Sequence, residues 1–389
     1  MSKISVNKKG ARRVKGGHLW IYRSDLVKIA ANGGEVVSVV DEGNNFLGKA
    51  FYSDKSEISL RFVTTRNEPV DRDFWKRRIK EAAALREAGG SGAEPTNARR
   101  LVNSEADLIP SLIVDDYDGN LVIQTLSQAT EKLKSTFVEI LREVFKPKSV
   151  LERNDARVRL LEGLEQINSV LWGDAAEEIT ILQDGIKFLV APLDGQKTGS
   201  FLDQRENHFA ARKYAFGKAL DCFTFSGGFA LNLSKSCDSV LGLDISEDAV
   251  KLATRNAELN KTKNVKFQTV NVFDALREFE KSGEKFDTIV LDPPAFVKNR
   301  AALNGAIRGY KEINLRALKL LNPGGILITC SCSYHFTEEL FMQILAEAAG
   351  DAHKRVHLIE KRMQASDHPV LIGMPESYYL KCLILRSLN

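Results

Sequence analysis

Several features that define other protein classes are absent from this sequence of 389 residues. No apolar run approaches the roughly 20 residues of a membrane-spanning helix, and the basic N-terminus has no apolar signal-peptide core, so we expect neither a membrane span nor a secretory signal. The five cysteines follow no disulfide spacing, which favours a reducing, cytoplasmic environment.

Two glycine-rich nucleotide motifs and a zinc motif are also incomplete. The glycines of residues 221–229 do not form G-x-G-x-x-G, and residues 195–198 (GQKT) lack the upstream glycine of a phosphate loop. Cys330, Cys332 and His335 lack a fourth ligand at the usual zinc spacing. These patterns therefore predict neither a dinucleotide site nor a metal site.

A strand, a glycine turn and a helix are nevertheless indicated around Asp221. The apolar residues before it lead into Cys222–Phe229 (CFTFSGGF), and the next apolar run ends at Asp244. Glycines let a backbone approach a ligand closely, and an acid about 20 residues later can accept hydrogen bonds from a ribose. Ribose recognition without a pyrophosphate cradle favours S-adenosylmethionine (SAM). The alternative is a turn that only packs a helix on its strand.

From about residue 186 the pattern alternates strand and helix, which predicts a doubly wound, Rossmann-like α/β sheet over residues 186–389. Ligands of such sheets bind outside the carboxyl ends of the strands. Five chemically capable residues fall at those ends, and this coincidence is stronger than any single motif. They are Asp221, Asp244, Asp274, Asp292 and Cys332.

Residues 1–72 are predicted to be all-β, with strands over 35–40, 46–52 and 58–63. A cluster of cations near the N-terminus suggests a polyanionic partner such as nucleic acid, although a solvated charged tail is the commoner outcome for a charge run. Trp20 could stack on a base or fill the core of a small barrel. The candidate RNA-binding residues are Lys8, Lys9, Arg12, Arg13, Lys15 and Trp20.

Residues 73–185 are predicted to form a small central α+β domain. Helices are indicated over about 71–88 and 129–145, and strands near 99–102, 112–115, 121–124 and 149–152. No titratable cluster here suggests catalysis, so we expect a spacing or RNA-contact role.

The candidate catalytic residues lie at the ends of two later strands. Asp292 is followed by two prolines that stiffen its turn, and Cys332 follows the next strand. A cysteine thiolate that adds to C6 of cytosine makes C5 nucleophilic toward the SAM methyl group, and protonated Asp292 could assist at N3. The alternative for Cys332 is a buried packing residue. Cys330 is either packing or a second thiol near the site.

These motifs together resemble the RlmI-type 23S ribosomal RNA cytosine-5 methyltransferases. The resemblance rests on residues 197–205 (KTGSFLDQR), 222–229, Asp292–Phe296 (DPPAF) and Ser331–Ser333 (SCS), and it extends over the whole chain. It implies an N-terminal PUA domain, a central domain and a C-terminal class I SAM-dependent methyltransferase domain.

By this resemblance, Cys332 is the nucleophile, and Asp292 remains the second candidate catalytic residue. The resemblance also implies that Asp244 holds the ribose of SAM and Asp274 the adenine amino group. The other cofactor-binding residues are expected to be Lys197, Thr198, Phe201, Gln204, Arg205, Asp221, Phe223 and Gly227, with Asp292 adjoining them. Two positions depart from the family pattern, Ala295, where lysine is frequent, and Cys330, where an apolar residue is usual.

Three functions remain open from the sequence. The leading one is formation of 5-methylcytidine in large-subunit ribosomal RNA, with SAM as cofactor and the RNA as partner. A guanine N-methyltransferase would use Asp292-Pro293-Pro294 and need no cysteine. A non-catalytic RNA-binding or assembly factor would not bind SAM. Neither a membrane nor a metal is expected as a partner, and the oligomeric state, with a homodimer as one option, is left open.

Overall fold

The structure is a computed structural model that describes residues 2–88, 95–193, 199–296 and 303–389. The chain folds into two compact units. Unit 1 comprises Met1–Ile181, Val190–Leu202 and Ser366–Ser377, and unit 2 comprises Leu182–Leu189, Asp203–Ala365 and Tyr378–Asn389. Division into three domains at residues 72 and 185 stays a prediction.

Unit 1 begins with a six-stranded sheet in the order β2-β6-β5-β4-β1-β3. The three strands expected from the sequence are present as β4, β5 and β6. The elements are β1 (Lys3–Val6), α1 (Lys8–Lys15), β2 (Trp20–Tyr22), η1 (Arg23–Asp25), β3 (Leu26–Ala30), β4 (Val36–Asp41), β5 (Phe46–Tyr52) and β6 (Ile58–Thr64).

Helix α1 is a feature that the sequence did not predict. The cations of the N-terminal cluster lie on this helix rather than on a tail. The Asn7 side chain caps it by accepting a hydrogen bond of 2.9 Å from the Gly10 N–H. The buried side of α1 is formed by Gly10, Ala11 and Val14, so the cations are directed away from the core.

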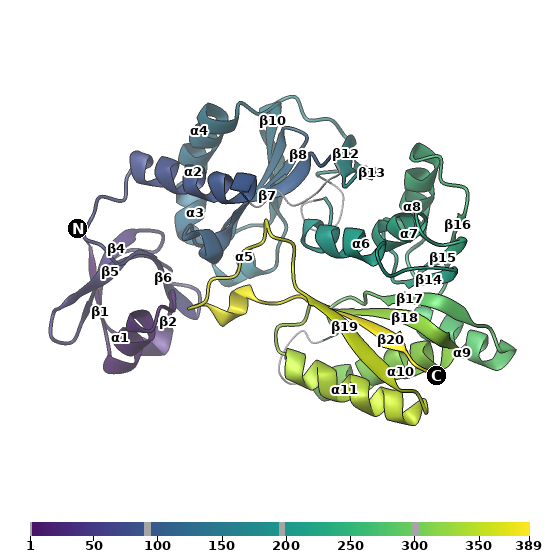
Figure 1. The fold of residues 1–389 in the computed structure, drawn as a ribbon. Coiled ribbons are helices and arrows are strands. Elements are labelled where there is room, and N and C mark those ends of the chain that lie inside the picture. The colour runs from purple at the N-terminus through teal and green to yellow at the C-terminus, as the bar shows by residue number, and fades with distance from the viewer. Residues whose placement is uncertain (1, 89–94, 194–198, 297–302) are drawn as a thin grey trace. The chain divides into compact units, whose positions relative to one another are not determined.

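A second, five-stranded sheet of unit 1 has the order β11-β10-β9-β8-β7. Helices α2 and α4 pack beside it (Figure 1), around a core that includes Trp75 and Phe137. The expected helix over 129–145 is two helices, because Leu133 between them has φ −89° and ψ 0° rather than helical values. The elements are α2 (Arg72–Ala88), β7 (Ala98–Asn103), η2 (Ser104–Asp107), β8 (Leu112–Tyr117), β9 (Asn120–Thr125), α3 (Gln128–Lys132), α4 (Lys134–Phe145), β10 (Ser149–Asn154), α5 (Val158–Leu161) and β11 (Ile167–Gly173).

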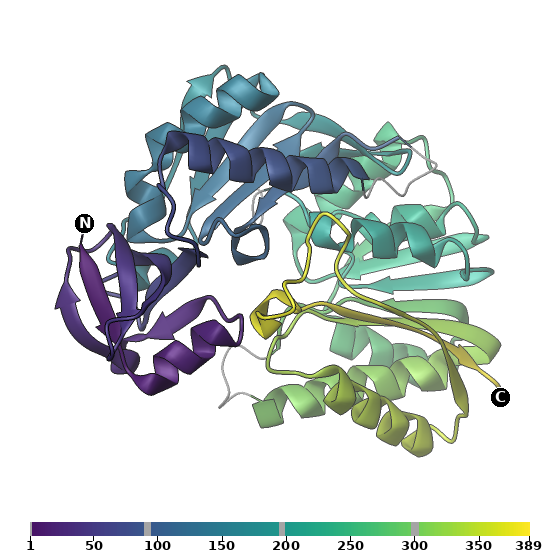
Figure 2. The same cartoon turned by 60° about the vertical axis from the view of Figure 1, so that its left-hand side comes forward.

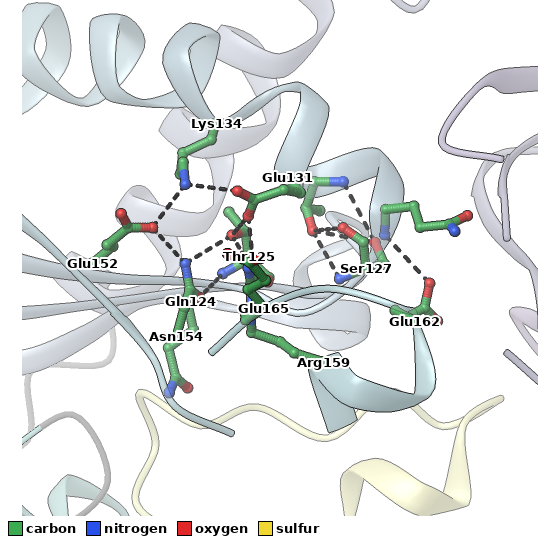
Figure 3. A network of polar contacts seen from close by, with 12 residues as sticks. Gln124, Thr125, Ser127, Glu131, Lys134, Glu152, Asn154, Arg159, Glu162 and Glu165 are labelled. Atoms are coloured by element: carbon green, nitrogen blue, oxygen red, sulfur yellow. Dashed lines mark hydrogen bonds and ion pairs between the residues drawn. The ribbon is translucent and has the colours of Figure 1, made fainter. Parts of the chain in front are cut away.

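A polar network ties the helices of this region to their sheet (Figure 3). The Glu131 carboxylate accepts hydrogen bonds from Lys134 at 2.7 Å, Arg159 at 2.9 Å and Thr125 at 2.6 Å. Lys134 also donates to Glu152 at 2.8 Å. These bonds satisfy charged groups that would be costly to bury alone.

Unit 2 contains a seven-stranded sheet in the order β16-β15-β14-β17-β18-β20-β19. The first five strands are parallel, and β20 is antiparallel to both β18 and β19. From residue 202 onward the elements are η3 (Leu202–Gln204), α6 (Arg205–Ala211), β14 (Lys218–Cys222), α7 (Gly228–Leu233), β15 (Ser239–Asp244), α8 (Glu247–Leu259), β16 (Val265–Thr269), α9 (Val272–Ser282), β17 (Phe286–Leu291), α10 (Leu303–Leu320), β18 (Leu321–Ser331), α11 (Glu338–Asp351), β19 (Val356–Arg362), η5 (Pro375–Ser377) and β20 (Lys381–Ser387). Of these, Leu202 and η5 belong to unit 1. A separate two-stranded sheet pairs β12 (Ile179–Gln183) with β13 (Ile186–Val190).

Helices cover both faces of the seven-stranded sheet, as the alternating pattern predicts (Figures 1 and 2). Side chains of α9, α10 and α11 fill the core on one face, and those of α6 and α7 fill the other. The Asn322–Gly325 stretch, whose proline and two glycines are typical of a turn, lies within β18. This architecture brings the ends of β14, β15, β17 and β18 to one edge of the sheet.

One segment late in the chain belongs to unit 1. Residues 366–377, between β19 and β20, leave the seven-stranded sheet. The Asp367 carboxylate accepts a 3.0 Å hydrogen bond from the Arg100 N–H, and Met374 is buried in the core of the N-terminal sheet. Unit 1 is therefore assembled from both early and late parts of the sequence.

Candidate active site

The loop after β14 has a strained backbone. Phe223, Phe225 and Gly227 have φ angles of 65°, 47° and 84°. Such values suit glycine but are unfavourable for phenylalanine, and strain of this kind is concentrated at ligand-binding sites. The loop thus curls tightly between the strand and helix α7, as the glycine turn predicted.

Asp221 stabilises this loop through hydrogen bonds. Its side chain is buried, and Oδ2 accepts hydrogen bonds from the Thr224 hydroxyl at 2.6 Å and the Ala230 N–H at 2.9 Å. Burial raises the pKa of Asp221 to about 7, against these hydrogen bonds. Its Oδ1 is buried and has no hydrogen-bond partner among the described residues. A hydrogen-bond donor of a ligand could therefore bind this oxygen.

Asp244 lies at the end of β15, beside the same loop. Its Oδ2 accepts a 2.9 Å hydrogen bond from the Phe225 N–H and its Oδ1 one of 2.9 Å from the Ser246 N–H. Each carboxylate oxygen can accept more than one hydrogen bond, so the side chain can still accept from a ribose. The strained loop is therefore fixed by an acid on either side.

Close packing explains the glycines next to this loop. A Cβ on Gly228 would lie 2.4 Å from Cε1 of His208, and one on Gly242 would lie 2.5 Å from Cδ1 of Phe267. Burial lowers the pKa of His208 to about 3, so its imidazole is neutral. With the orphaned Asp221 oxygen and the Asp244 carboxylate, the loop fits a nucleoside ligand without phosphates, such as SAM.

The other predicted cofactor residues differ in their surroundings. Arg205 lies near Asp184 at 3.5 Å and Glu206 at 3.4 Å. Asp274, in the first turn of α9, is exposed and lies 3.3 Å from Arg277. Phe201 belongs to unit 1, and Lys197 and Thr198 lie outside the described residues. The cofactor roles of these residues stay predictions.

Asp292 directly follows β17 and has a defined partner. The Gln204 side-chain amide donates a 2.8 Å hydrogen bond to Oδ1 of Asp292. Gln204 is held in turn by Asn207, which donates to its Oε1 at 2.7 Å. The predicted cofactor residue Gln204 and the predicted catalytic residue Asp292 are therefore in direct contact.

Cys332 follows β18, the strand next to β17. The parallel register pairs Leu291 with Thr329, so Asp292 and Cys332 leave the sheet at the same edge. The hydroxyl groups of Ser331 and Tyr310 are hydrogen-bonded at 2.9 Å. Burial raises the pKa of Tyr310 to about 12, and the charges of Cys332 and Asp292 act in the same direction. Tyr310 thus lies close to both candidate catalytic groups.

Cys330 is a core residue. It is fully buried, pairs with Cys382 across β18 and β20, and burial raises the pKa of its thiol well above the usual range. Of its two predicted alternatives, this geometry favours packing. Cys332 is partly exposed, unlike the buried Cys222, Cys237, Cys330 and Cys382. No group of three or more acidic, histidine or cysteine side chains in the described ranges is arranged to hold a metal ion.

One residue of the site was missed by the sequence analysis. Lys381, at the start of β20, is buried and donates a 2.7 Å hydrogen bond to the carbonyl oxygen of Ser333. The register pairs it with Ser331. The only sequence signal is a lysine that opens the apolar run CLIL.

The predicted RNA-binding residues lie in the N-terminal sheet region. Lys8, Lys9, Arg12 and Lys15 are exposed on α1. Arg13 stacks over the ring of Tyr22 at 4.5 Å. Trp20 is half-buried, and its indole N–H donates a 3.1 Å hydrogen bond to Glu105, which favours the packing interpretation for this side chain.

No helix in the described part of the chain is long and apolar enough to cross a membrane. Residues 4–65 match a family model described as a PUA-like domain, and residues 217–368 match one described as a methyltransferase domain. The N-terminal sheet and the C-terminal Rossmann-like sheet therefore have the fold classes that the sequence predicted.

Curated relatives match nearly the whole chain. Ribosomal RNA large subunit methyltransferase I of Tolumonas auensis is 42% identical over 380 residues, which cover 95% of this chain and 96% of the relative. The protein of the same name from Aeromonas hydrophila is 39% identical over 379 residues, covering 95% of each chain.

Solved structures support the fold. A SAM-dependent methyltransferase structure from Streptococcus mutans has a TM-score of 0.85 at 20% identity and covers 99% of this chain and 100% of that chain. The crystal structure of the methyltransferase SMU.776, complexed with SAH, has a TM-score of 0.86 at 20% identity, with the same coverage. The chain therefore belongs to the ribosomal RNA large subunit methyltransferase I family, and it is a methyltransferase that uses SAM as its cofactor.

Proposed function

We propose that this protein forms 5-methylcytidine in large-subunit ribosomal RNA, with Cys332 as a covalent nucleophile. The observation that carries the proposal is the pair of adjacent parallel strands β17 and β18, which end next to Asp292 and Cys332. The influence of both groups on Tyr310 supports their proximity. The names of the curated relatives support ribosomal RNA as the substrate class.

When bound, SAM supplies an electrophilic methyl group. The Cys332 thiolate forms a bond to C6 of the cytosine, and the C5–C6 double-bond electrons become available at C5 for methylation. Asp292 in its protonated form donates a hydrogen bond to N3 as the adduct forms. Loss of the C5 proton to a base then restores the double bond, and the C6–S bond breaks to release Cys332. The base that accepts this proton is not assigned.

Binding of the cofactor is proposed for the loop of residues 223–227 together with Asp244. The positive φ angles and the unpartnered Asp221 oxygen support this position. Binding of RNA is proposed for helix α1, which carries cations and has no acidic residue in its first turn. A cytosine inside a duplex or stack would have to be extruded to reach Cys332.

The test has two parts, both with the full chain. Methyl-labelled SAM and large-subunit ribosomal RNA from cells that lack the enzyme are incubated, and the RNA is digested to nucleosides. Labelled 5-methylcytidine is expected. Labelled methylguanosine would overturn the proposal and move the chemistry to Asp292-Pro293-Pro294, which can hold an exocyclic amine.

The second part tests the nucleophile. RNA with 5-fluorocytidine at the target should form a stable protein–RNA adduct in the presence of SAM, because fluorine cannot leave C5 as a proton does. Cys332→Ala should abolish the adduct. The buried Cys330→Ala is the matched control and should retain it. An adduct that survives in Cys332→Ala would exclude Cys332 as the nucleophile.

A further inference from the structure

Lys381 is a buried cation at the edge of the candidate active site. It is 2% exposed, and its Nζ donates hydrogen bonds to the carbonyl oxygens of Ser333 at 2.7 Å and Tyr379 at 3.0 Å. Both acceptors are neutral. Within the described residues, no carboxylate forms an ion pair with Lys381. A buried ammonium without a counter-charge is costly, so an anion close to it is stabilised.

Lys381 contacts or faces the residues on both sides of Cys332. The antiparallel register of β18 and β20 pairs it with Ser331, immediately before Cys332. Its ammonium group binds the carbonyl oxygen of Ser333, immediately after Cys332. The ammonium group is therefore bound one residue away from Cys332 along the chain, and the charge of Cys332 acts on it.

We propose that Lys381 is a positioning residue for the nucleophile. Its ammonium group provides the counter-charge that holds Cys332 as a thiolate. A thiolate, and not a thiol, is the reactive species, so this would raise the fraction of Cys332 that can attack C6. The inference deepens the proposed function and rests on Cys332 as its nucleophile.

Acidic groups also surround Lys381 and Cys332. Asp292 approaches from the end of β17, and Glu338 of α11 acts electrostatically on Lys381. The charge of Glu338 disfavours a nearby thiolate, whereas Asp292 in its proposed protonated form adds no negative charge. Further titratable groups around the pair are Cys330 on β18, Cys382 on β20, Tyr310 on α10, Tyr334 and His335 after β18, Tyr378 and Tyr379 before β20, Asp203 bonded to Tyr379, and Lys361 of β19 bonded to Glu338.

The titration of Lys381 is compatible with this role. Burial lowers its pKa to about 8, and the negative charges of Cys332 and Glu338 oppose that effect. The amine is therefore protonated below about pH 8 and can balance a thiolate in the neutral range. Removal of the lysine charge should therefore raise the pKa of the Cys332 thiol.

The experiment measures thiol reactivity without RNA or SAM. The full-length protein is treated with iodoacetamide between pH 5.5 and 10, and alkylation of Cys332 is followed by peptide mass mapping, which separates it from the four buried cysteines. An ordinary thiol titrates near pH 8.5. We expect the wild-type midpoint to lie below that value. A wild-type midpoint at or above 8.5 would overturn the proposal without any variant.

Three variants sharpen the result. Lys381→Met should raise the midpoint by about one pH unit and slow alkylation at pH 7 about tenfold, because the thiolate fraction falls by that factor. Lys381→Arg keeps the charge and should restore most of the effect. Lys251→Met, which removes an exposed lysine on α8, is the control and should leave the midpoint unchanged. An unchanged midpoint in folded Lys381→Met would also overturn the proposal.

This readout is separate from the identity of the methylated atom. If the wild type makes no 5-methylcytidine but Lys381→Met shifts the alkylation midpoint, the charge pairing is correct and the proposed function fails. If 5-methylcytidine forms and the midpoint does not depend on Lys381, the proposed function stands and the role of Lys381 fails. Normal alkylation together with accumulation of a methylated adduct in Lys381→Met would instead identify the lysine as the base that accepts the C5 proton.

Discussion

The side-chain amide of Gln204 donates its 2.8 Å hydrogen bond to Asp292 in a fixed orientation, because its oxygen is already occupied by Asn207. Asn207 in turn accepts a 2.9 Å hydrogen bond from Arg362. This chain of contacts sets the direction of the carboxyl group that follows β17. The orientation of Asp292 therefore depends on residues of η3, α6 and β19.

We expect Gln204→Ala to lower kcat about 10- to 100-fold, because leaving the Asp292 oxygen without its hydrogen-bond partner costs roughly 1–3 kcal/mol. Steady-state methylation of ribosomal RNA measures this loss. Gln343→Ala, which removes an exposed amide on α11, should behave as wild type. Equal activity of the two variants would show that Asp292 needs no orientation by Gln204.

Gly228 is predicted to be required for the glycine loop. In Gly228→Ala, the new methyl group would meet the His208 ring, which we expect to cost about 1–3 kcal/mol of stability and to weaken SAM binding. Gly350 of α11 is the matched control, because a Cβ there meets nothing within 4 Å. Gly350→Ala should stabilise the protein by up to about 1 kcal/mol through helix propensity. Thermal denaturation and calorimetric titration with SAM measure both effects, and similar behaviour of the two variants would contradict the close-packing argument.

The buried Asp221 predicts a pH-dependent stability. Its folded pKa of about 7 lies above the ordinary value, so the folded state binds the proton more tightly and this group's contribution to stability falls as pH rises from about 4 to 7. Asp221→Asn removes that dependence. Relative to wild type, the variant without SAM should gain stability between pH 5 and pH 8, by at most about 3 kcal/mol. Chemical denaturation at the two pH values tests this, and a relative loss would contradict it.

Glu131 predicts the opposite dependence in unit 1 (Figure 3). Burial would raise its pKa, but hydrogen bonds from Lys134, Thr125 and Arg159 outweigh burial and lower it to about 2. The stability from this group is present above about pH 4.5 and is lost as pH falls toward 2. Glu131→Gln should cost about 1–2 kcal/mol at pH 7, a value reduced because the side chain is 25% exposed. Urea denaturation at pH 7 and pH 3 should show the difference between variant and wild type shrinking in acid.

The sequence predicted the seven-stranded sheet well because its elements are locally encoded. Helix α8 (Glu247–Leu259) and strand β17 (Phe286–Leu291) follow the alternating pattern of the sequence. Both combine a clear apolar period with defined ends. In α8 the Ser246 side chain also caps the first turn.

Two other features could not be read so directly. Helix α1 buries only small residues on one side, so its pattern resembles a charged tail, and the capping Asn7 was its only start signal. Lys381 gains its importance from a strand pairing with Ser331, which is 50 positions earlier in the sequence. Pairing at such a distance leaves no local pattern, so a lysine before an apolar strand gives no indication of its partner.

The segment 366–377 has a consequence for the order in which the protein folds during synthesis. The two sheets of unit 1 are synthesised first. Met374 and Asp367, whose carboxylate binds the Arg100 N–H, are synthesised only after nearly all of unit 2. Domains usually fold as units while the chain grows. Here the core of the N-terminal sheet lacks Met374 until the late segment has been synthesised. We therefore expect the final packing of this core and the completion of the seven-stranded sheet to occur nearly together.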